Sequence, residues 1–242
     1  TLDGKENPLK DQGMDTLIIG DQITHVSDYL LYKEEGNLYH SHGVQSIQIG
    51  KNVESIGKYA FHCEISLKNV KFTGNVIQKI GDNCFRMCRN LEDIQLPDTV
   101  FELGEWCFAE CTGLKTVELS NSLKEISSNC FYRCELLKEI SIPDNVSDIN
   151  YAAFQNCSGL KNIKFSSNSS ITKIENYAFS DCVRLEDVSF PDSLVKIGAN
   201  AFNNCIRLEK INLPDSLYEI KYNAFGGCSR LNNVSVPGSV KI

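Results

Sequence analysis

The 242-residue sequence lacks several features that would assign it to a common functional class. It has no apolar run approaching the roughly 18 residues that cross a bilayer, so we predict no membrane span in this chain. It has no excess of basic residues: 24 Lys and Arg against 31 Asp and Glu give a formal net charge of −7. This charge argues against nucleic acid and against an anionic membrane surface as main partners. The sequence also begins without Met and without a charged-then-apolar signal pattern, which we interpret as a processed or trimmed fragment.

Signals for catalysis are missing as well. No Ser/His/Asp order, Gly-rich phosphate loop or repeated carboxylate pair stands out. The four His residues all lie early, at His25, His40, His42 and His62. His40 and His42 would share a face of an extended segment and could seat a metal ion with His25 or an acid, but a single H-x-H is weak evidence, and we expect solvated surface His. We therefore predict no enzyme, no cofactor and no metal site, with an enzyme or metal protein that uses the His-rich start as the alternative.

The sequence does contain one unit that is copied along most of its length. The clearest copy is Leu185–Leu208, and the copies carry a Phe at steps of 23 to 25 residues, each followed six residues later by a Leu. A period of this length predicts a solenoid in which each repeat is one coil stacked on the last. The repeat Phe residues are Phe61, Phe85, Phe108, Phe131, Phe154, Phe179, Phe202 and Phe225.

Each unit contains two apolar pairs with different spacing. The first alternates, as in Ile140/Ile142, which predicts a half-buried strand. Some 18 residues connect successive strands, so the strands must run parallel, because a hairpin needs far less chain. The second pair is spaced by three residues, as in Leu194/Ile197, and is followed by Ala-Phe and Cys, which predicts one or two turns of helix on the outer side.

The repeat pattern also divides the chain. Residues 1–43 are predicted to be an N-terminal tail and an irregular capping repeat, because Asp15–Leu31 is a degraded copy of the unit and the residues after it lack the Cys. The regular solenoid is predicted over residues 44–242. It stops partway through a coil and without a polar cap, so we expect more repeats or another domain to follow in the full-length protein.

The repeated motif L-x-x-I-x-L-P-x-S-L-x-x-I-G-x-x-A-F-x-x-C resembles the BspA-like, or Treponema-type, class of leucine-rich repeats. The resemblance covers residues from about 44 to 242. It implies a leucine-rich-repeat solenoid of α/β type, with short parallel strands on a concave face. We expect about ten coils of roughly 23 residues, one strand per coil, and short helix or turn segments on the convex side. In that family the repeats occur mainly in exported surface proteins of bacteria and of some parasitic protists, with adhesion or protein binding as the usual inferred role.

The eleven Cys residues invite a metal or redox interpretation, but the repeat accounts for them. Eight are assigned to the repeat's Cys position, including Cys63, and Cys84, Cys107 and Cys130 stand where other units have Ala. Because free Cys behaves as a small buried hydrophobe, we predict a buried, reduced ladder. A thiolate metal site built from C-x3-C pairs such as Cys84/Cys88 and an isolated disulfide remain the alternatives.

The predicted strands also define a candidate binding surface. Their outward positions on the concave face include four acids and three Lys, which nearly cancel, and no aromatic residue of the kind that dominates protein hot spots. A solubilising surface is the alternative to a broad polar contact with a protein. The candidate contact residues are Lys71, Asp93, Gln95, Glu118, Glu139, Lys164, Asp187 and Lys210.

One further ladder consists of Arg184, Arg207 and Arg230, each directly before the unit's Leu. Stacked like charges repel unless they are paired, and Glu186 and Glu209 are near enough to pair with them. We expect an internally paired, solvated edge. A site for an anion or an acidic partner is the alternative.

Together these features predict a non-catalytic protein-binding or adhesion module of a secreted, extracellular or cell-surface protein. The ligand would be a protein, such as a host or extracellular-matrix protein, contacted along the concave face. The alternative is a structural spacer or scaffold that presents a neighbouring domain. The sequence does not assign the oligomeric state.

Overall fold

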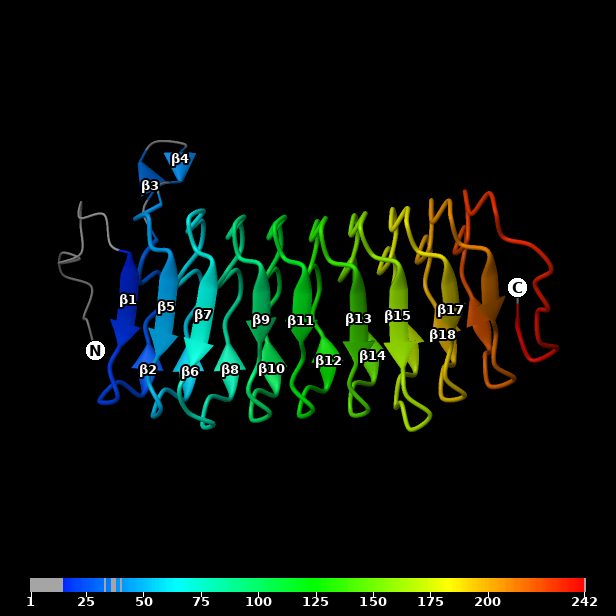
Figure 1. The fold of residues 1–242 in the computed structure, drawn as a ribbon. Coiled ribbons are helices and arrows are strands. Elements are labelled where there is room, and N and C mark those ends of the chain that lie inside the picture. Colours follow the sequence, from blue (N-terminus) through cyan, green and yellow to red (C-terminus); the bar gives the residue numbers. More distant parts are fainter. Residues whose placement is uncertain (1–14, 33, 36–37, 40, 242) are drawn as a thin grey trace.

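The computed structural model describes residues 15–32, 34–35, 38–39 and 41–241. These residues form a solenoid whose coils stand in a single row between the two ends of the chain (Figure 1). Eight coils of about 23 residues are regular, one around each repeat Phe. The expected count of about ten included the irregular first coil and the incomplete last one.

Each coil contributes a strand of three or four residues to one side of the solenoid, which we call the long-strand face. All its strand pairings are parallel, and each residue pairs with its equivalent in the next coil, as Ile140 does with Ile163. The strands form three sheets in the orders β1-β5-β7, β9-β11 and β13-β15-β17-β19. Their bounds are β1 Thr16–Ile19, β5 Ser46–Ile49, β7 Asn69–Phe72, β9 Asp93–Gln95, β11 Thr116–Glu118, β13 Glu139–Ile142, β15 Asn162–Phe165, β17 Asp187–Ser189 and β19 Lys210–Asn212.

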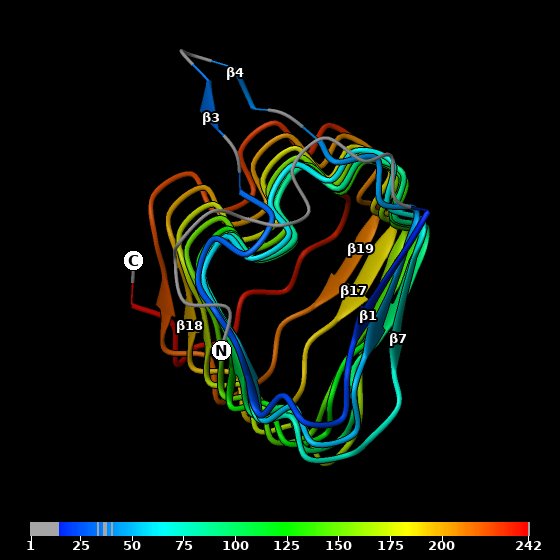
Figure 2. The same cartoon turned by 90° about the vertical axis from the view of Figure 1, so that its left-hand side faces the viewer.

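A second strand of two residues lies on another side of each coil, where the sequence predicted the start of a helix. These short strands also pair in parallel, in the orders β2-β6-β8-β10 and β12-β14-β16-β18-β20. Their bounds are β2 His25–Val26, β6 Ser55–Ile56, β8 Lys79–Ile80, β10 Glu102–Leu103, β12 Glu125–Ile126, β14 Asp148–Ile149, β16 Lys173–Ile174, β18 Lys196–Ile197 and β20 Glu219–Ile220. An antiparallel hairpin, β3 Glu34–Glu35 and β4 Leu38–Tyr39, projects from the outline of the coils (Figure 2).

The predicted convex helices are wrong, because the part of the chain that the structure describes contains no helix. The third side of each coil is a chain of tight turns around the repeat Phe, and we call the stack of these segments the turn ridge. It comprises residues 28–32, 58–64, 82–88, 105–111, 128–134, 151–157, 176–182, 199–205 and 222–228.

The hydrogen bonds of the turn ridge differ from those of a helix, because its backbone N–H groups alternate between two kinds of carbonyl partner. The N–H groups of Asn83, Phe85 and Met87 donate to carbonyl oxygens of the next coil at 2.8–2.9 Å. The N–H groups between them donate to the carbonyl three residues back, as Arg86 does to Asn83 at 3.2 Å. Two residues in each coil, two before and two after the Phe, take a left-handed backbone, with φ of 54° at Asn83 and 63° at Met87. A positive φ at the third residue of a four-residue turn is the geometry of a type II turn, and it is incompatible with a continuing α-helix.

The three sides enclose one continuous core. The repeat Phe residues from Phe61 to Phe202 are fully buried, and neighbouring rings lie 5.1–5.5 Å apart from centroid to centroid. Such near-parallel rings bury a large apolar area per coil and add a modest stacking term. No helix capable of crossing a membrane occurs among the described residues.

Candidate functional site

All eight predicted contact residues are exposed on the long-strand face. They occupy alternate strand positions, so the intervening apolar residues point into the core. Because the strands pair in register, Gln95 lies beside Glu118 across β9 and β11, and Asp187 lies beside Lys210 across β17 and β19. The outward set is therefore arranged in rows that run along the solenoid.

The acidic charge on this face is concentrated in its middle. The Nζ atom of Lys164 lies 2.8 Å from Oε2 of Glu139, so this Lys neutralises a neighbouring acid. Both side chains are more than half exposed, and such a surface pair contributes between zero and about 1 kcal/mol to stability. Asp93 and Glu118 make no ion pair with any described residue, which leaves uncompensated negative charge on β9 and β11.

Two grooves open on the same face where the sheets are interrupted. One, of about 750 Å³, lies between β7 and β9 and reaches β11; its lining includes Lys71, Asp93, Asp98 and Glu118. The other, of about 500 Å³, lies between β11 and β13 and is also lined by Glu118. Acidic side chains thus line both grooves, and Glu118 is common to them.

The Arg ladder lies exposed on successive coils. The Nη1 atom of Arg230 is 3.2 Å from Oε1 of Glu209, which confirms the pairing predicted for this Arg. Arg184 and Arg207 are exposed and make no ion pair with a described residue, so the predicted pairing does not extend to them. An anion site at this edge stays a prediction.

The Cys residues form the predicted buried ladder. All eleven are free thiols; ten are buried and Cys228 is half-buried. In seven successive coils the Sγ atom donates a hydrogen bond to the carbonyl oxygen of the Phe one coil earlier, at 3.1–3.3 Å, as Cys111 does to Phe85. Burial raises the pKa of the Cys111 and Cys157 thiols to about 12. These thiols are therefore protonated at neutral pH and make poor nucleophiles or metal ligands.

The expectation of solvated His is wrong for two of the four residues. His25 is exposed and its Nδ1 lies 2.8 Å from Oγ of Ser55, but the side chain of His42 is 6% exposed and His62 is buried. Burial, with a contribution from the positive charge of Arg86, lowers the pKa of His62 to about 4. His40 lies outside the described residues. Across the described part of the chain no three His, Cys, Asp or Glu side chains gather as metal ligands would.

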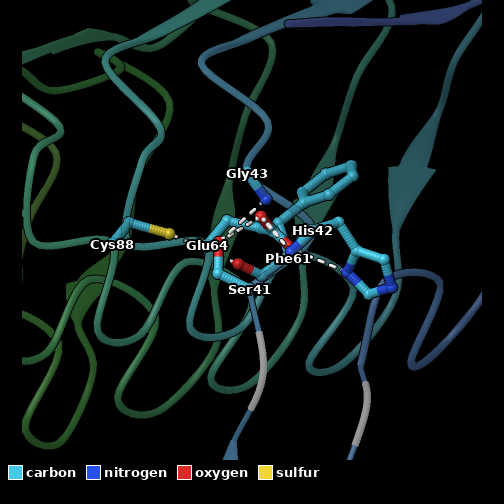
Figure 3. Close-up of polar contacts among 6 residues, drawn as sticks. All are labelled: Ser41, His42, Gly43, Phe61, Glu64 and Cys88. Atoms are coloured by element: carbon cyan, nitrogen blue, oxygen red, sulfur yellow. Dashed lines mark hydrogen bonds and ion pairs between the residues drawn. The ribbon is translucent and has the colours of Figure 1, made fainter. Parts of the chain in front are cut away.

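His42 is buried because it contacts Glu64, a residue that the sequence interpretation missed (Figure 3). Glu64 lies three residues after Phe61, at the position that Cys occupies in the other coils, and its side chain is fully buried. Its carboxylate accepts hydrogen bonds from Oγ of Ser41 at 2.9 Å, from Nδ1 of His42 at 2.8 Å and from the backbone N–H of His42 at 3.1 Å. Cys63, assigned from sequence to the repeat's Cys position, instead takes the left-handed position of the turn, with φ 62°.

The combination of Ser41, His42 and Glu64 has the residue types of a hydrolytic triad but not its geometry. Both Ser41 and His42 donate to the same carboxylate, and within the described residues no hydrogen bond joins the Ser hydroxyl to the imidazole. A Ser nucleophile needs that bond to lose its proton. The arrangement instead ties residues 41–43, at the foot of the β3–β4 hairpin, to the first regular coil.

Parallel coils around a closed apolar core, with polar side chains on the outer faces, define a repeat solenoid of the leucine-rich type. The model of the BspA type leucine-rich repeat region matches residues 33–161 and 149–242, with six copies. The chain belongs to this family.

The solved structures of two proteins, the first two described here, show the same fold. The leucine-rich repeat protein of T. pallidum is 23% identical over 72% of this chain and 79% of its own, with a TM-score of 0.62. The pneumococcal vaccine antigen PcpA is 23% identical over 86% of this chain and 62% of its own, with a TM-score of 0.57. A leucine-rich cell surface protein from Faecalibacterium prausnitzii is 22% identical over 92% of this chain and 87% of its own, with a TM-score of 0.36. No curated protein matches the sequence.

Proposed function

We propose that this chain is a non-catalytic protein-binding or adhesion module that contacts its partner along the long-strand face. The observation that carries the proposal is the pair of acid-lined grooves on rows of exposed polar side chains, held by strands in strict register. A surface held this rigidly loses little conformational entropy when it binds, so more of the contact energy remains for affinity.

The acidic grooves favour a partner that presents Lys or Arg. Asp93, Glu118 and Glu139 lie on three neighbouring strands, so a basic segment crossing them would meet several carboxylates at once. Complementary charge of this kind accelerates association and makes it dependent on salt concentration. We propose a host or extracellular-matrix protein as the partner and the cell surface as the location, on the basis of the family to which the chain belongs.

The experiment compares two variants that remove the same number of negative charges. The face variant carries Asp93→Asn, Glu118→Gln and Glu139→Gln; the control carries Glu54→Gln, Glu105→Gln and Glu125→Gln, all at exposed positions away from the long-strand face. Adhesion of the purified chains to immobilised extracellular-matrix proteins is measured at low and at physiological salt. We expect the face variant to lose at least about tenfold in affinity and the control to retain binding.

A spacer that presents a neighbouring domain is the second candidate. The continuous stack of buried Phe residues along the coils supports it, because such a core needs no ligand to hold its shape. Equal adhesion by the face variant and the control would contradict the binding-face proposal and favour the spacer.

A further inference from the structure

We propose that the turn ridge carries a second protein-contact surface, centred on Trp106, for a partner surface with little net charge. This surface is distinct from the long-strand face: the two lie on different sides of the coil, which Figure 2 shows along the solenoid. It consists of Arg86, Trp106, Glu110 and Tyr132, extended toward the N-terminal end by Tyr29 and Tyr59.

The chain's aromatic hot-spot residues are collected on this ridge rather than on the long-strand face. The only Trp in the sequence is half-buried at its centre, with the guanidinium of Arg86 4.9 Å from the ring centroid. Tyr132 packs against Trp106 in a T-shaped arrangement, with centroids 5.5 Å apart. Trp, Tyr and Arg are the residue types most enriched among interface hot spots, and here Trp106 contacts both Arg86 and Tyr132.

Backbone geometry gives a second reason to expect a function for the aromatic residues of the ridge, Trp106 among them. It lies two residues before Phe108, where every coil requires a left-handed backbone, and its φ is 59°. Four coils fill this position with Asn, the residue type that tolerates this conformation best after Gly, and three others fill it with Tyr: Asn83, Asn129, Asn200 and Asn223, and Tyr29, Tyr59 and Tyr177. An aromatic residue is disfavoured there and gains no full burial in return. The turn and the core therefore do not require the aromatic residues that this ridge places here, of which Trp106 contacts Arg86 and Tyr132 in the neighbouring coils.

The arrangement of the rings favours a protein over a carbohydrate. A sugar stacks on an open ring face, whereas the guanidinium of Arg86 covers one face of Trp106. Tyr29 and Tyr59 likewise stack on each other, at 5.1 Å and 8° between planes. A partner can therefore contact the ring edges and the polar tips of these residues. Among the described residues, no hydrogen bond involves the indole N–H of Trp106 or the hydroxyls of Tyr29, Tyr59 and Tyr132. Apolar edges combined with unused donors suit a protein surface.

The charges of this surface are already compensated. Nη2 and Nε of Arg86 lie 2.8 and 3.2 Å from the same oxygen, Oε1 of Glu110, and the two side chains are 31% and 20% exposed. A partner therefore needs no charge of its own to neutralise them. This distinguishes the Trp106 surface from the acid-lined grooves, whose partner is expected to be basic.

The test uses a naive peptide-display library as the probe and the full chain as the immobilised target. The affinity of each clone enriched on the unmodified chain is then measured on the Trp106→Asn variant. This substitution introduces the residue that four other coils use at this position, so the variant is expected to fold at least as stably as the unmodified chain. The matched control is Tyr218→Asn, which removes another exposed aromatic residue with a cation over its ring, Lys241 at 4.8 Å. Tyr132→Leu provides a second variant of the surface itself.

We expect enriched clones to lose at least about tenfold in affinity on Trp106→Asn and Tyr132→Leu, and to keep it on Tyr218→Asn and on the long-strand face variant. Their affinity should change little with salt. Clones whose binding is indifferent to Trp106, or no enrichment at all, would overturn the proposal. So would binding to a glycan array that requires Trp106, which would identify a carbohydrate site, or a Trp106-dependent dimer in sedimentation, which would identify a second copy as the occupant.

Discussion

The thiol of Cys111 donates a hydrogen bond to the carbonyl oxygen of Phe85 in the preceding coil, with sulfur and oxygen 3.1 Å apart. The same oxygen also accepts the N–H of Cys88, at 3.2 Å. The repeat therefore uses Cys at this position both as a small apolar group and as a donor that joins one coil to the next. Ala could supply the first property but not the second.

This role predicts different costs for two Cys substitutions. Cys157→Ala removes the thiol that donates to Phe131, so we expect the free energy of unfolding to fall by about 1–2 kcal/mol. Cys130→Ala is the control, because other coils have Ala at that position, and it should cost less than about 1 kcal/mol. Urea-induced unfolding measures both. Equal costs would contradict the role assigned to the thiol hydrogen bond.

The buried thiols also predict that the protein loses stability in alkali. Burial raises the pKa of Cys111 and Cys157 from the ordinary value of 9.0 to about 12. Below pH 9 both thiols are protonated in the folded and the unfolded chain, so they add no pH dependence. Above pH 9 they ionise only in the unfolded chain, so the free energy of unfolding should fall by up to about 1.4 kcal/mol per pH unit and thiol until pH 12.

Urea unfolding at pH 8, 9 and 10 checks this expectation. A variant with Cys111→Ala and Cys157→Ala serves as the comparison and should show a shallower decline above pH 9. An identical slope in the variant would mean that these thiols ionise in the folded chain as well.

His62 predicts the opposite dependence in acid. Burial, assisted by the positive charge of Arg86, lowers its pKa to about 4, below the ordinary value of 6.5. As pH falls from 6.5 to 4 the unfolded chain binds a proton at His62 while the folded chain does not, so stability should decrease over this range and be fully present above it. His62→Gln should reduce the decrease. An NMR titration of the imidazole with a midpoint near 6.5 would contradict the expectation.

Glu64 and His42 predict strong coupling between two substitutions. His42→Ala leaves the fully buried carboxylate without its imidazole partner, so we expect a loss of about 3–5 kcal/mol. Adding Glu64→Cys removes the carboxylate and restores the residue that the other coils use, so the double variant should be more stable than His42→Ala alone. A double-mutant cycle measures the coupling. Additive losses would show that the pair does not anchor residues 41–43.

The two apolar pairs of the repeat differ in how well sequence could predict them. Alternation such as that of Ile140 and Ile142 identified the long strands, because no other element exposes every second residue. The length of the connections between them, some 18 residues, identified their parallel pairing. The spacing of three, as in Leu194 and Ile197, is shared by helices and by chains of turns, so the helix prediction failed. The signal that distinguishes them is the recurrence of Asn two residues before the Phe, as at Asn83 and Asn129, where the backbone is left-handed.

The candidate sites could be predicted only in part. Alternation located the outward residues of the long-strand face, but the grooves depend on where the sheets part, for which the repeat gives no signal. Glu64 was missed because Cys63, one residue earlier, was aligned with the repeat's Cys. The centre of the Trp106 surface joins residues from three coils, and it emerges only when the coils are stacked in register.

Titration of the thiols with a water-soluble disulfide reagent tests the central claim, a closed core shared by stacked coils, most directly. In the native protein at pH 8 we expect Cys228, the half-buried thiol, to react ahead of the others, and the ten buried thiols to react only on the timescale of unfolding. In denaturant all eleven should react at once. Rapid reaction of several thiols in the native chain would contradict the fold described here and the faces assigned from it.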